Sequence, residues 1–273
     1  MEYPETFKQL VADSDCPDFI GWGNPNAKIL LLHNDPVINI SKKPTSRRYT
    51  PEITNNKRDW ENNIANNTGF DEIFDNYSTT RLCGNPLYPY CWQKYQLKRQ
   101  KSGISSDEYT NLKCYQSQKL INEIFHKDSD RNANLDFYKY CFISNVSEKS
   151  ARYYRLANPL EAHKTYVCNR QKFLLKDFFK QFPIIIISPH LDICRYPNNY
   201  DKYIHDTFEV ERVEKIDVRR CWDYLWVKDV YQNNNKLLIS AYYYLTDSVL
   251  TTIVSHIHTY QEEKGIDLMP DSF

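Results

Sequence analysis

The chain has 273 residues, with 35 Lys and Arg against 35 Asp and Glu, so its formal net charge is zero. A global basic field is therefore excluded, and any nucleic-acid binding would need a local basic patch. Hydrophobic residues make up 41% and aromatic residues 15% of the chain, which excludes disorder as its main state. The length suits one large α/β domain, and we expect a single domain over residues 1–273.

The first residues and the cysteines indicate a reduced, cytoplasmic protein. Residues 1–10 are polar and of mixed charge, unlike a secretory signal, and no apolar run reaches the length of a membrane helix. The eight Cys residues include no C-x-x-C pair, so neither disulfides nor a zinc or iron–sulfur site is expected. We expect no metal, no cofactor and no membrane contact.

Four short apolar runs predict a buried parallel sheet. Each run is continuous rather than alternating and is bounded by polar turn residues, which is the pattern of strands buried on both faces. The four predicted strands are residues 27–33, 138–144, 183–188 and 236–241.

The segments around these runs carry helical periodicity or helix-start signals. The predicted helices are residues 5–13, 106–126, 159–179 and 246–263. Together they predict a doubly wound, three-layer α/β fold with a mainly parallel, four-stranded central sheet. An insert at about residues 195–235 alternates in places, and we expect it to add a strand pair.

In such a sheet, ligands bind at the carboxyl ends of the strands, where the strand order reverses. The residues that follow the predicted strands there are Asn34 and Asp35, then Asn145, then Pro189 and His190, and finally Tyr242 to Tyr244. A Rossmann-like enzyme is one alternative, but no G-x-G-x-x-G follows a strand, and P-loop and G-x-S-x-G motifs are also absent.

The block Gly21-Trp22-Gly23-Asn24-Pro25 leads into the first predicted strand, and His33-Asn34-Asp35-Pro36 follows that strand. This arrangement resembles the uracil-DNA glycosylase superfamily, in which a G-x-G-N-P entry precedes the first catalytic motif. Phe142-Ile143-Ser144-Asn145 matches the superfamily strand that ends in a base-reading Asn, and residues 85–90 resemble a segment of glycosylase-like relatives. The resemblance implies a uracil-DNA glycosylase-like fold, DNA as the partner, and cleavage of a damaged or modified base such as uracil or a phage-type base.

The chain departs from the superfamily pattern at several positions. The H-P-S motif after the fourth strand is replaced by Ser240-Ala241-Tyr242, His33 stands where the first motif opens with Gly, and Val37 stands where the best-known branch has Tyr. These departures favour either an unusual substrate or a catalytically silent binder of nucleic acid or nucleotide that reuses the pocket.

Cleavage of an N-glycosidic bond develops positive charge on the sugar and negative charge on the departing base. The Asp35 carboxylate can stabilise the sugar or activate a water, and His190 is the second catalytic candidate. The amides of Asn145 and Asn34 can read a base edge. The alternatives are an Asx-turn at Asp35, a helix N-cap or loop amide at Asn145, and a structural role for His190.

A flipped base also needs an aromatic ring to stack on, and the alternative role for such rings is packing in the core or in a loop. The candidate rings are Tyr88, Tyr90 and Trp92. Basic residues gather in segments that should open on the same edge, where they would bind phosphates unless they are ordinary surface charges. The predicted contacts to the DNA backbone are Lys42, Lys43, Arg47, Arg48, Arg152 and Arg155.

Overall fold

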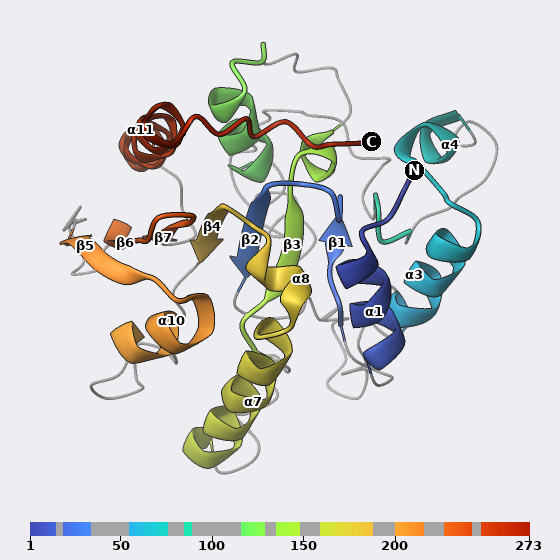
Figure 1. Ribbon diagram of the computed structural model, residues 1–273, viewed down its shortest axis with the longest axis horizontal. Helices are drawn as coiled ribbons and strands as arrows, with labels where there is room; N and C mark the ends of the chain where they lie inside the picture. Colours follow the sequence, from blue (N-terminus) through green and yellow to red (C-terminus); the bar gives the residue numbers. More distant parts are fainter. Residues whose placement is uncertain are drawn as a thin grey trace, which may run out of the picture.

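The computed structural model describes residues 1–14, 19–33, 55–75, 85–88, 116–128, 135–147, 159–187, 200–215, 227–241 and 247–273. These residues form an α/β fold around a mixed, seven-stranded sheet of order β1-β3-β2-β4-β7-β6-β5 (Figure 1). The predicted α/β class is confirmed, and the prediction of four strands is corrected to a wider, mixed sheet.

Four neighbouring strands of this sheet are parallel. In spatial order they are β3 (Phe142–Asn145), β2 (Ile29–His33), β4 (Ile184–Ile187) and β7 (Leu237–Ala241). Each of them overlaps one of the four predicted runs. Every residue in them is buried except His33, which is partly exposed. Burial on both faces explains why these runs are continuously apolar.

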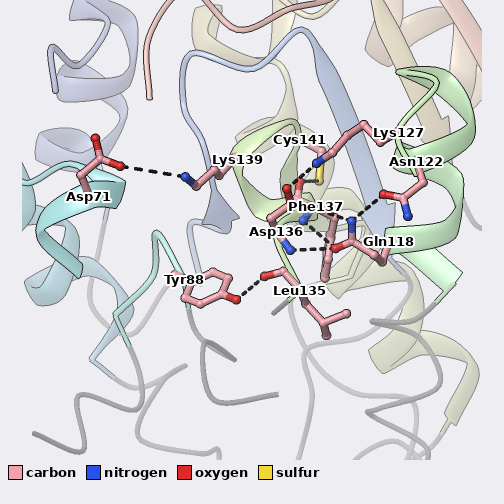
Figure 2. A network of polar contacts seen from close by, with 10 residues as sticks. All are labelled: Asp71, Tyr88, Gln118, Asn122, Lys127, Leu135, Asp136, Phe137, Lys139 and Cys141. Atoms are coloured by element: carbon pink, nitrogen blue, oxygen red, sulfur yellow. Dashed lines mark hydrogen bonds and ion pairs between the residues drawn. The ribbon is translucent and has the colours of Figure 1, made fainter. Parts of the chain in front are cut away.

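β3 corresponds to the second predicted strand, but it begins later than the predicted start at residue 138. The residues before it form a 3-10 helix, η2 (Phe137–Lys139). The buried side chain of Gln118 accepts hydrogen bonds at Oε1 from the backbone nitrogens of Asp136 and Phe137, over 2.7 and 2.9 Å (Figure 2). These bonds hold the backbone in a turn, so β3 starts only at Phe142.

The remaining strands lie at the two sides of the sheet and are antiparallel to their neighbours. β1 (Trp22–Gly23) pairs with β3, β6 (Val227–Gln232) pairs with β7, and β5 (Glu211–Lys215) pairs with β6. The strand pair expected in the insert is therefore confirmed. All five residues of β5 are exposed, and its charged side chains suit an outermost strand that must not pair further.

Helices pack around this sheet (Figure 1). They include α1 (Glu5–Asp13), α3 (Asn56–Ala65), α4 (Phe70–Asp75), α7 (Pro159–Leu174), α8 (Asp177–Lys180), α10 (Tyr200–Phe208) and α11 (Asp247–Lys264), and residues 116–124 are also helical. The predicted helix 159–179 is divided in two because Lys176 has an extended backbone, with φ −63° and ψ 149°. None of the helices in the described part of the chain is both long and apolar enough to cross a membrane.

Aromatic rings join the helices to the sheet at Phe142 of β3. Its ring centroid lies 5.7 Å from that of Phe7 in α1, 5.0 Å from that of Phe178 in α8, and 6.2 Å from that of Trp60 in α3. All four rings are buried. This cluster anchors β3, the strand whose carboxyl end carries Asn145.

Candidate functional site

The carboxyl ends of β2 and β3 lie next to each other. The two strands are neighbours in the sheet (Figure 1). They are parallel, and their register pairs His33 with Asn145. The backbone nitrogen of Val146 donates a 2.8 Å hydrogen bond to the carbonyl oxygen of His33, which extends the pairing by one step. The expectation that these strands are adjacent and parallel is confirmed, so β2 ends beside Asn145.

Asn145, the predicted base-reading residue, is buried and incompletely bonded. Its relative exposure is 4%, and among the described residues its side-chain nitrogen Nδ2 has no hydrogen-bond partner. Leaving a buried amide donor unpaired costs about 1–3 kcal/mol. A ligand atom that accepts a hydrogen bond would remove this cost, which makes Asn145 the strongest candidate for a ligand contact at this edge.

A buried arginine fixes the backbone that carries Asn145. Arg170 of α7 is 3% exposed and donates from Nε to the carbonyl oxygen of Asn145 over 2.9 Å and from Nη2 to Ser144 Oγ over 2.6 Å. Ser144 Oγ in turn donates to the carbonyl oxygen of Ile20 over 2.8 Å. The guanidinium also stacks on the Phe173 ring, 4.0 Å from its centroid. The carboxyl end of β3 is therefore held rigidly, with a positive charge beside it.

Arg170 was not among the residues predicted from the sequence, although a signal for it exists. It lies three residues after Val167 and four residues before Leu174, and both of these are buried. This spacing puts Arg170 on the inward stripe of α7. A cation on such a stripe must be bonded internally, and at this position its partners are at the end of β3.

The Gly-Trp-Gly-Asn-Pro block builds the framework of the fold. Gly23 has φ +91°, and a Cβ atom there would lie 2.3 Å from the carbonyl oxygen of Cys141. The buried side chain of Asn24 donates from Nδ2 to the carbonyl oxygens of Lys139 and Ser272, over 2.9 and 2.8 Å. These contacts dock the end of β1 against the residues that precede β3 and against Ser272, at the edge opposite Asn145.

Tyr88, predicted to stack on a base, lies in the core. It is 0% exposed, and its hydroxyl donates to the carbonyl oxygen of Leu135 (Figure 2). Its ring meets that of Tyr138 edge-on, with centroids 5.8 Å apart. Both partners precede β3, so Tyr88 is near the amino end of that strand while Asn145 is at its carboxyl end. This position favours the packing alternative for Tyr88.

The other predicted site residues lie outside the described residues. They are Asn34, Asp35, Tyr90, Trp92, His190, Lys42, Lys43, Arg47, Arg48, Arg152 and Arg155. Within the described part of the chain, no group of three or more His, Cys, Asp or Glu side chains could hold a metal ion.

Two cavities are lined by residues away from the His33–Asn145 edge. One is a groove of about 610 Å³ between the helical residues 116–124 and α11, where His258 Nε2 lies 3.1 Å from the carbonyl oxygen of Ile124. The other, of about 660 Å³, includes Lys28 and Pro183, which directly precede β2 and β4. It therefore opens at the amino edge of the parallel strands.

Comparisons of the chain with protein-family models, curated proteins and solved structures found no match.

Proposed function

We propose that this chain is a DNA glycosylase-like protein, which binds DNA at the carboxyl edge of its parallel strands and hydrolyses the N-glycosidic bond of a damaged or modified base. The observation that carries the proposal is the buried side-chain amide of Asn145, whose Nδ2 has no partner among the described residues. A side-chain amide donor without an acceptor can bind a base that has been flipped out of the DNA stack, because the edge of that base supplies an acceptor atom.

Asp35 is the proposed catalytic carboxylate. It follows the last residue of β2 by two positions, and that residue, His33, is paired with Asn145. Two residues span at most about 7 Å, so we propose that the Asp35 carboxylate acts at the same edge as the Asn145 amide. A carboxylate there can stabilise the positive charge that develops on the sugar or take a proton from the attacking water.

The proposal is tested with labelled oligonucleotides, single-stranded and duplex, that contain uracil, hypoxanthine or a glucosylated base. Alkali cleaves the strand wherever a base has been removed, so the expected result is one cleaved band for at least one base. The Asn145→Ala variant should lose about tenfold or more of this activity, since it leaves the polar groups of the base unpaired. The matched control is Asn66→Ala, which alters an exposed asparagine at the end of α3. Absence of a cleaved band with every substrate would exclude the glycosylase activity.

The proposed contacts to the DNA backbone are tested by a salt titration of binding. Each phosphate that a cation neutralises adds to the slope of affinity against salt concentration. Replacing Arg47 and Arg48 with Ala should weaken binding to all sequences alike and reduce that slope by about two. An unchanged slope would remove this segment from the path of the DNA.

A second candidate function is a catalytically silent binder that uses the same pocket. The favouring observation is Ser240, which lies inside β7 and opens the stretch that stands in place of the superfamily's H-P-S motif. Its side chain is fully buried, and its Oγ lies 2.8 Å from the hydroxyl oxygen of Tyr200 in α10. This hydroxyl therefore joins the insert to the sheet and does not replace a histidine. Persistent binding of base-modified DNA without any alkali-sensitive product would support this second function.

A further inference from the structure

His33 differs from every other residue of the four parallel strands. The remaining residues of β2, β3, β4 and β7 are buried, whereas His33 is partly exposed at the carboxyl end of β2. Its φ is not positive, so the extended backbone carries the imidazole without strain. A titratable, hydrogen-bonding ring thus stands at the edge of an otherwise buried set of strands.

The register brings this ring to Asn145. His33 and Asn145 are direct partners in the parallel pairing of β2 with β3. Neighbouring residues in register project from the same face of a sheet, and neighbouring strands are about 4.8 Å apart. The imidazole and the carboxamide are therefore adjacent on one face. The backbones of both residues are also fixed, through Val146 at His33 and through Arg170 at Asn145.

We propose that His33 is a specificity-determining residue of the site and that its imidazole binds the edge of the nucleobase beside the atom that Asn145 binds. This inference rests on the proposed function. A neutral imidazole offers one donor and one acceptor, as a carboxamide does. Together the two side chains complement a planar heterocycle with two hydrogen-bonding atoms on one edge, and they discriminate against a base that lacks the second atom.

The first test observes both side chains while free nucleosides are added. Uridine, inosine, cytidine and adenosine are titrated in turn into the isotope-labelled full chain, and the His33 ring and Asn145 amide signals are followed by NMR. The signals are assigned with His33→Asn and Asn145→Asp variants. We expect at least one nucleoside to shift both signals. If every nucleoside that shifts the Asn145 amide signal leaves the His33 ring signal unchanged, this inference is overturned and the proposed function stands. No shift of either signal would overturn both.

The second test measures preference among bases. For each variant, the affinity is measured for DNA single strands that contain one uracil, hypoxanthine, cytosine or adenine. The ratio of the strongest to the weakest of these four affinities is then compared between variants. His33→Ala should lower this ratio about tenfold, the effect expected for one hydrogen bond, and His33→Asn should lower it less. The control is His205→Ala, which removes an imidazole that is 53% exposed on α10. A normally melting His33→Ala variant with an unchanged ratio would show that the ring does not read the base.

Discussion

Arg170 donates a hydrogen bond from Nε to the backbone carbonyl oxygen of Asn145 over 2.9 Å, and both residues are buried. The same guanidinium bonds Ser144 Oγ, so one side chain of α7 satisfies two oxygens at the end of β3. A planar, forked donor is needed to reach both oxygens at once, and the ammonium group of lysine does not have this geometry.

We therefore expect Arg170→Lys to destabilise the protein although it preserves the charge. At least one of the two buried oxygens would lose its donor, which costs about 1–3 kcal/mol. Chemical denaturation followed by circular dichroism gives the free energy of unfolding. The control is Arg58→Lys, because the side chain of Arg58 is 64% exposed and its ion pair with the adjacent Asp59 should contribute little. Equal stability of the two variants would show that the fork at Arg170 does not support β3.

Gly23→Ala should destabilise the fold more than Gly265→Ala does. Both glycines have positive φ, +91° and +63°, so both substitutions carry a backbone penalty of roughly 1–2 kcal/mol. At Gly23 the new methyl group would also lie 2.3 Å from the carbonyl oxygen of Cys141, whereas at Gly265 nothing lies within 4 Å. The difference between the two melting temperatures isolates the steric contact. Equal melting temperatures would mean that β1 can move away from β3 without cost.

The strands that carry the site were predictable because runs of apolar residues in the sequence indicate strands buried on both faces. Ile184 to Ile187 is apolar at every position and the neighbouring runs are mostly apolar, since both faces of each strand are covered. β1 could not be found in this way, because two residues are too few to show a period. Its position instead depends on Gly23 and Asn24, whose partners precede β3 and are distant in the sequence.

Some helices and contacts were not predicted from the sequence because polar residues occupy buried positions in them. The buried stripe of α3 contains Asn56, Trp60 and Asn63, so its hydrophobic periodicity is weak. Asn56 is buried because its side chain bonds the backbone of Ile20 and Gly21. Arg170 was missed for the same reason, since its burial depends on hydrogen bonds to oxygens at the end of β3 and not on apolar contacts alone.

Alkaline titration should reveal the buried phenol of Tyr260. Burial raises the pKa of Tyr260 to about 12, and among the described residues its hydroxyl has no hydrogen-bond partner. The unfolded chain has the ordinary pKa of about 10. Because the folded pKa is the higher one, the stability contribution of this group is complete below pH 10 and is lost as the pH rises towards about 12.

Tyr260→Phe should therefore flatten the fall in stability between about pH 10 and pH 12 relative to the wild type, with little loss of stability at neutral pH. Thermal melts at a series of pH values give the two slopes, and absorbance at the phenolate band follows ionisation directly. Parallel slopes would indicate that this phenol ionises as freely in the folded protein as in the unfolded chain.

The final prediction concerns Asp35. If the protein is an active glycosylase, Asp35→Asn should lower the rate of base removal by about 10²–10³, the usual effect of removing one preorganised electrostatic group. Folding and DNA binding should be nearly unchanged, because the amide keeps the shape and one acceptor oxygen of an Asx-turn. The asparagine amide cannot stabilise the positive charge on the sugar or take a proton from water.

The Asx-turn alternative for Asp35 predicts the opposite pattern, which is a small change in stability with normal activity. Single-turnover cleavage of a working substrate, with thermal melts on the same samples, separates the two. A variant that melts normally and cleaves at the wild-type rate would remove Asp35 from the catalytic role and leave Asn145 and His33 as a binding pair without a nearby carboxylate base.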